Sequence, residues 1–188
     1  MPVRPVREIR RVRRDVVAVL CGAMVAVLLT AVTLAQDVAT TNLKAAYIYQ
    51  FALFTQWPAD ALPQAEPLTM CVVGDTNVRE ALERTVKDAK VGGRRVVVAF
   101  GQPDKPPAGC HALYVSAVSS AQAARLVAGL RDLPILTISD LEGFNKMGGI
   151  VEFVYQGGQL RFSIRSEAVT QSHLQLSSKL LSLARAPR

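Results

Sequence analysis

Two cysteines are the residues of this chain with the most evident chemistry. Cys71 lies in an apolar run at 68–74, and Cys110 directly precedes a second apolar run at 112–116. The third cysteine, Cys21, lies in an N-terminal apolar stretch that an export signal would remove. Two thiols would then remain in a compartment where thiols oxidise, and we expect them to form one disulfide. A bridge that closes a loop of this length contributes roughly 4 kcal/mol to stability in the chain-entropy model.

Residues for enzymatic chemistry are few. The two histidines, His111 and His173, belong to no metal-binding spacing, and the sequence has no nucleophile elbow, phosphate-binding P-loop or dinucleotide fingerprint. A disulfide would leave no free thiol in the mature chain. The sequence therefore predicts a protein without catalytic residues, metal site or cofactor.

A ligand site is predicted at one edge of the expected sheet. In open α/β sheets ligands bind beyond the carboxyl ends of the strands, and backbone N–H groups at a helix start can hold a small anion or aromatic ligand there. The alternative, which we favour, is that Asp75 and Asp140 only cap the segments that follow them. The candidate rim residues are Gly74, Asp75, Ser116, Ser139, Asp140, Phe144, Gly148 and Gly149.

The N-terminus is typical of an exported protein. Six arginines lie within the first fifteen residues, residues 16–34 carry no charge, and Thr33-Leu34-Ala35 places small residues at the positions that signal peptidase reads. We expect a signal peptide over 1–35 and a periplasmic domain over 36–188. The alternative is an uncleaved inner-membrane anchor formed by residues 16–34.

The basic charge of the chain belongs mostly to this leader. The whole chain has a net charge of +7. Six arginines against Glu8 and Asp15 give the leader +4, so the remainder carries only +3. No basic run in the remainder is interleaved with aromatic residues, and we expect no nucleic-acid binding.

Strands and helices alternate along the mature chain. Strands are predicted over 68–74, 94–100, 113–116 and 134–139, with helices over 75–86 and from Ser119 or Ser120 to Leu130. Two strands at 150–155 and 160–164 flank Gly157-Gly158 as a hairpin. This order predicts an α/β fold: a single-domain three-layer sandwich whose mainly parallel sheet ends in an antiparallel hairpin and has helices on both faces.

Two further helices are expected at the ends of the domain. One runs from a cap at Asn42 to about Gln56 and ends before Trp57-Pro58. Its aromatic face packs on the core or, alternatively, faces a partner. The other helix is expected over 171–184, where Ser177-Ser178 interrupts a series of leucines.

The segments together resemble the YfiR family. The order and spacing of the matching motifs cover nearly all of 43–185. The motifs are KAAYIYQF at 44–51, QWP at 56–58, CVVGD at 71–75, VGGR at 91–94, CHALYVS at 110–116, LTISD at 136–140, GF at 143–144, GGIV at 148–151 and LSSKLL at 176–181.

This resemblance implies a function. The family's type member is a periplasmic inhibitor that holds an inner-membrane diguanylate cyclase inactive, and an outer-membrane lipoprotein sequesters it, which raises cyclic di-GMP and biofilm formation. The resemblance also implies a homodimer, sensitivity to redox state and a disulfide at Cys71 and Cys110. The alternative is a periplasmic small-molecule-binding sensor subunit that acts with a membrane histidine kinase or cyclase.

Partner contacts are expected on exposed aromatic and polar side chains, because a few such anchors carry the binding energy of most interfaces. In the last strand of the hairpin, polar residues alternate with apolar ones, which predicts one face that is solvated or binds something. The candidates are Tyr49, Phe144, Arg161, Ser163 and Arg165.

Overall fold

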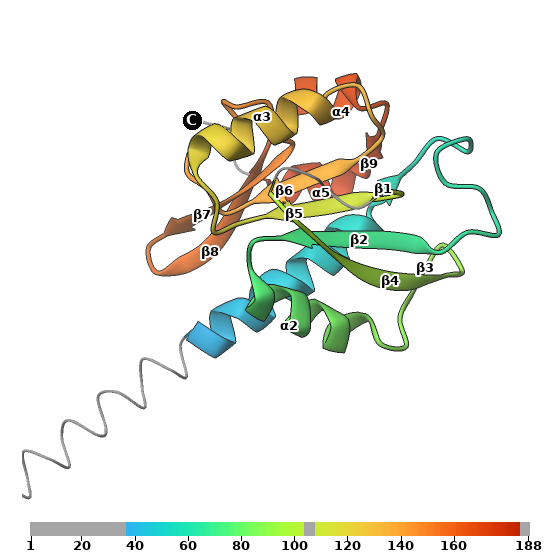
Figure 1. Ribbon diagram of the computed structural model, residues 1–188, viewed down its shortest axis with the longest axis horizontal. Coiled ribbons are helices and arrows are strands. Elements are labelled where there is room, and N and C mark those ends of the chain that lie inside the picture. Colours follow the sequence, from blue (N-terminus) through green and yellow to red (C-terminus); the bar gives the residue numbers. More distant parts are fainter. Residues whose placement is uncertain (1–36, 104–107, 185–188) are drawn as a thin grey trace, which may run out of the picture. The chain divides into compact units, whose positions relative to one another are not determined.

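The computed structural model describes residues 37–103 and 108–184 (Figure 1). The chain divides into two compact units, 1–40 and 41–188, and the second unit contains the sheet. The predicted signal peptide, its alternative as an anchor over 16–34, and Cys21 lie outside the described residues.

A seven-stranded sheet forms the centre of the second unit, in the order β3-β4-β2-β5-β6-β7-β8. The five inner strands run parallel, and each edge strand is antiparallel to its neighbour. The predicted mainly parallel sheet with a C-terminal hairpin is therefore confirmed. The strands are β2 (Leu68–Val73), β3 (Lys90–Val91), β4 (Arg94–Gly101), β5 (Ala112–Val115), β6 (Leu136–Ser139), β7 (Val151–Gln156) and β8 (Gln159–Ile164).

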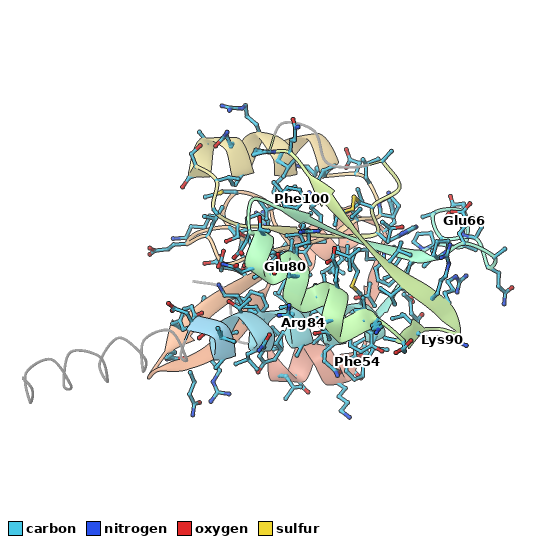
Figure 2. The ribbon with its side chains drawn as sticks, turned by 60° about the horizontal axis from the view of Figure 1, so that its bottom comes forward. Phe54, Glu66, Glu80, Arg84, Lys90 and Phe100 are labelled. Atoms are coloured by element: carbon cyan, nitrogen blue, oxygen red, sulfur yellow. A yellow bond between two sulfur atoms is a disulfide. The ribbon has the colours of Figure 1, made fainter. Side chains whose placement is uncertain are left out.

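Helices cover both faces of the sheet (Figure 1). A helix over 37–53 and α2 (Thr76–Val86) contribute Phe51 and Leu82 to the larger buried cluster. On the other face, α3 (Ser120–Leu130) contributes Leu126 to a second cluster around the disulfide. The exposed side of α2 carries Glu80 and Arg84 (Figure 2), as expected for an amphipathic helix. The three-layer α/β arrangement agrees with the prediction.

The N-terminal helix differs from its predicted limits. It is already helical at residue 37 and ends at 53, so Asn42 lies inside it and is no cap. The next residues form β1 (Thr55–Gln56), which pairs with β9 (Gln175–Leu176). The paired residues are 121 and 119 positions apart in the sequence, and local propensity does not reveal so distant a partner.

The C-terminal helix predicted over 171–184 is wrong. The segment contains the end of α4 (Ser166–Gln171), then β9, then α5 (Ser178–Leu183). His173 lies in the turn after α4 with φ of 53° and is exposed. The Ser177 hydroxyl accepts a hydrogen bond from the Leu180 N–H and caps α5. The serines that interrupt the leucines thus mark a helix start, because serine satisfies free N–H groups at that position.

Candidate functional site

The predicted disulfide is present. Cys71 in β2 bonds to Cys110 just before β5, with 5.9 Å between their Cα atoms. Both sulfur atoms are buried in the second cluster, beneath α3. The bridge links the interior of β2 to the segment that enters β5, and β5 runs alongside β2 from Met70 and Ala112 onward.

The histidine beside the disulfide has a structural role. His111 Nδ1 accepts a hydrogen bond from the Thr69 N–H at 3.0 Å, which places its proton on Nε2, 3.2 Å from the Ala61 carbonyl oxygen. Burial lowers the pKa of His111 below its ordinary 6.5, so the ring is neutral at pH 7. Both ring nitrogens are occupied with backbone groups and are not positioned for proton transfer.

Asp140 is the centre of a polar cluster beyond the end of β6. Lys44 Nζ, from the N-terminal helix, lies 2.5 Å from Asp140 Oδ2, and the Ser116 hydroxyl donates to Oδ1 at 2.6 Å. Burial alone raises the pKa of Asp140, but the hydrogen bonds from Lys44 and Ser116 and the charge of Lys44 outweigh it, so the pKa is lower than usual. Asp140 is therefore ionised and paired at neutral pH.

Tyr114 is buried beside this cluster. Its hydroxyl makes no hydrogen bond of ordinary length to any described residue. Burial, followed by the negative charge of Asp140, raises the pKa of the phenol far above its ordinary value of 10.0. Tyr114 is neutral at every physiological pH and is not a general base.

The predicted rim residues Gly74 and Ser116 meet through their backbones. Gly74 has φ of 90°, and a Cβ atom there would lie 1.8 Å from the Ser116 carbonyl oxygen, so only glycine allows this approach. Asp75 caps α2 by accepting from the Val78 N–H, as the favoured alternative predicts. Asp140 has a different role from the predicted cap, because it bonds the side chains of Lys44 and Ser116.

The loop between β6 and β7 is held in place by hydrogen bonds to buried polar side chains. The Glu152 carboxylate accepts hydrogen bonds from the Gly143 N–H at 3.0 Å and the Asn145 N–H at 2.9 Å. The Asn145 amide donates to the Gly149 and Ile150 carbonyls. Ser139 belongs to this region too, with its hydroxyl donating to the Val115 carbonyl at 2.6 Å.

Phe144 and the glycine pair lie inside this loop. Phe144 is fully buried, and its ring packs so closely on Gly149 that a Cβ atom there would lie 2.1 Å from a ring carbon. Gly148, with φ of 107°, lies against Val127 of α3. The expectation that Phe144 is an exposed partner anchor is therefore wrong, because it is needed as the core of the loop.

A pocket of about 580 Å³ lies beside Asp140. Of the predicted rim residues only Asp140 lines it; the partner-contact candidate Ser163 also does. Sequence reasoning missed the remainder, although Glu152, an acidic residue in an apolar strand, is a visible signal. The lining consists of Asp140, Glu142, Gly143, Lys146, Glu152, Phe153, Val154, Tyr155, Gln156 and Ser163.

The other partner-contact candidates differ in exposure. Arg161 is exposed on β8, and Tyr49 is half-buried with its hydroxyl 3.3 Å from the Lys90 carbonyl oxygen. Ser163 is buried and donates to Asn145 Oδ1 at 2.6 Å. The alternation of polar and apolar residues predicts a polar face of β8 that is solvated or binds something, but this face is not solvated along its whole length. Arg165 is half-buried and donates to the Asn145 carbonyl at 2.8 Å.

The described part of the chain has neither a metal-binding cluster nor a membrane-spanning helix. In residues 37–103 and 108–184, no group of three or more histidine, cysteine, aspartate and glutamate side chains is placed to hold a metal ion. In the same ranges, no helix has the length and apolar character needed to cross a membrane.

Fold and site together define a small α/β domain with one buried disulfide and a polar pocket at the carboxyl edge of its sheet. A family model described as YfiR/HmsC-like matches residues 41–185, and the chain belongs to this family. The match covers every strand of the sheet, the disulfide and the whole of the pocket lining.

Proposed function

We propose that the protein is a non-enzymatic periplasmic regulator of cyclic di-GMP signalling. In this proposal it binds and restrains an inner-membrane signalling protein of the diguanylate cyclase type. It acts as a homodimer, and an outer-membrane lipoprotein competes for it. Membership of the YfiR/HmsC-like family carries the proposal, and it supports the general role more directly than any particular partner.

The disulfide supports the location. Buried disulfides persist in oxidising compartments such as the periplasm and are rare in the cytosol. Cys71 and Cys110 are joined beneath α3, where the bond is shielded by apolar side chains. A periplasmic protein can reach the outer domain of a membrane cyclase without entering the cytosol.

The chemistry of the site supports a binding role. His111 is neutral and held by backbone groups, and Asp140 is ionised and paired with Lys44. A general base must reach a substrate proton, and a nucleophile needs such a base beside it. Neither residue is placed for those tasks.

The test is to delete the gene and to complement it with the full chain or with a chain that lacks residues 2–35. We expect deletion to raise cellular cyclic di-GMP, and only the full chain to lower it again. A tagged full chain, cross-linked in intact cells, should recover an inner-membrane protein with a cytoplasmic cyclase domain. Unchanged cyclic di-GMP after deletion, or full complementation by the leaderless chain, would contradict the proposal.

The pocket of about 580 Å³ favours one alternative, a small-molecule-binding sensor subunit, because drug-sized ligands occupy pockets of about 300–1,000 Å³. A thermal-shift screen of the purified protein against metabolites distinguishes the two functions. A ligand that raises the melting temperature of the protein, and loses this effect in Glu142→Gln with Lys146→Met, would support the alternative. A screen without any stabilising compound would count against it.

A further inference from the structure

The β7–β8 hairpin extends past the strand beside it. β6 and β7 pair only at Ile138↔Val151 and Ser139↔Glu152, and β6 ends there, but β7 continues to Gln156. The hairpin lies at the opposite side of the sheet from β3 and β4 (Figure 1). The outer half of β7 therefore has β8 on one side and no strand on the other.

The hairpin register shows which backbone groups face this open side. Gly157-Gly158 forms a two-residue turn, so Gln156 and Gln159 are the hydrogen-bonded pair next to it. Hydrogen-bonded and non-bonded pairs alternate along an antiparallel ladder, and Tyr155 consequently points its N–H and carbonyl away from β8. Among the described residues, no strand or loop backbone pairs with these groups.

The pocket lies along this open edge. Its walls are the β6–β7 loop with Glu142 and Lys146 on one side and the outer half of β7 on the other. Three carboxylates, Asp140, Glu142 and Glu152, line it against the single cation Lys146. Lys44 balances Asp140, so an excess of negative charge remains among the lining residues, with Arg161 of β8 paired opposite the lining residue Val154. Tyr155, 58 % exposed, lies at the margin and offers an aromatic surface.

We infer that this edge binds an extended peptide segment of a protein partner, and that the segment carries a lysine or arginine. The segment adds a short strand to β7 through the free N–H and carbonyl of Tyr155, as in other cases of strand addition to a sheet edge. Its basic side chain enters the pocket toward Glu142. The inference deepens the proposed function, on which it rests only for the source of the segment.

The test uses the full chain purified from the cell envelope and a capped pentapeptide of alternating valine and lysine. We expect saturable binding by fluorescence anisotropy, with chemical-shift changes confined to 140–146 and 153–156. Tyr155→Pro, which removes the N–H on the open side only, should weaken binding about tenfold, because one backbone hydrogen bond is lost and its partner is left unpaired. Tyr155→Val is the matched control: it loses the same aromatic ring but keeps the N–H, so it should bind the peptide about tenfold more tightly than Tyr155→Pro.

Changes in the peptide test the same contact without altering the protein. N-methylation of alternate amides should abolish binding in one of the two registers, and glutamate in place of lysine should weaken it at least about tenfold through repulsion by the carboxylates. Equal binding of N-methylated and plain peptides, or of free lysine and the peptide, would overturn the inference. So would an oligomer that dissociates in Tyr155→Pro, because the edge would then pair with a second copy. None of these readouts depends on cyclic di-GMP, so this inference and the proposed function can fail separately.

Discussion

At the scale of single residues, the polar groups at the carboxyl edge of the sheet are matched to one another. Lys44 comes from the N-terminal helix, Ser116 from the end of β5 and Asp140 from the end of β6, and the three meet in one cluster. The side chains of Lys44 and Asp140 are only 12 % and 15 % exposed, so neither charge is well solvated without the other. Breaking such a pair leaves an uncompensated charge, which costs more than the pair itself contributes.

Lys44→Met is expected to destabilise the protein by about 2 kcal/mol at pH 7, because Asp140 remains partly buried without its cation. The pKa of Asp140 lies below its ordinary value of 3.8, so its stabilising contribution is complete above that pH and is lost as the pH falls through the lower, folded-state pKa. The difference between the unmodified chain and Lys44→Met should therefore shrink below about pH 4. Urea unfolding between pH 2.5 and 7 measures it.

An exposed pair provides the control for this prediction. Arg79 and Glu83 are spaced four residues apart on α2 with 3.0 Å between Nη1 and Oε1, and both side chains are substantially exposed. Glu83→Gln should cost no more than about 0.5 kcal/mol. A loss in Lys44→Met as small as in Glu83→Gln, or one independent of pH, would show that the cluster is as solvated as the surface pair.

At the scale of elements, the sequence was most informative where the local signal and the tertiary contacts agree. The hairpin was predictable because Gly157 and Gly158 both have positive φ, as the tight turn requires. Buried parallel strands such as β2 were predictable from their apolar runs. The prediction of one helix over 171–184 was wrong because the leucines there have helical spacing, while the backbone at Gln175 pairs with β1 instead. Most of the pocket lining was missed for a similar reason: the pocket depends on β7 being longer than β6, which is a tertiary feature and not a local signal.

The glycine at the end of β2 gives a prediction at this scale. Gly74→Ala should destabilise the domain by about 3 kcal/mol or more, since the new methyl group must displace the Ser116 backbone in addition to the unfavourable positive φ. Gly158→Ala is the matched control: its φ of 74° is similar, but no atom lies within 4 Å of the added Cβ. It should cost only about 1–2 kcal/mol. Thermal unfolding of both variants under one buffer condition tests the difference, and equal losses would refute the close approach of Gly74 to Ser116.

At the scale of the whole molecule, one covalent bond connects location, stability and function. Cys71 and Cys110 are separated by 39 positions, and the loop between them contains α2, β3 and β4, so the bridge restricts a large part of the unfolded chain. Cys71 lies within β2, and Cys110 lies at the end of the sheet opposite Asp140, because Cys110 precedes β5 and Asp140 follows β6, its parallel neighbour. Reduction would therefore act on the fold as a whole and leave the residues of the pocket chemically unchanged.

The prediction is that reduction lowers the free energy of unfolding by about 4 kcal/mol, as expected for loop closure of this size. Urea unfolding of the purified full chain, with and without dithiothreitol, measures the effect of the bond without any change of sequence. Cys71→Ser with Cys110→Ser should resemble the reduced protein and should no longer respond to dithiothreitol. In cells, the same double variant should restrain cyclic di-GMP less well and be recovered in smaller amounts.

The comparison of stability with repression decides how the bond acts. If the loss of repression follows the fraction of folded protein, the disulfide serves the regulator only by keeping it folded. Repression should then return when the variant is produced at a lower growth temperature, where more of it is folded. A double variant as stable as the oxidised protein would contradict the entropic argument. A fully folded variant that still fails to repress would show instead that the partner contacts the region around the bridge, beneath α3 and beside β5.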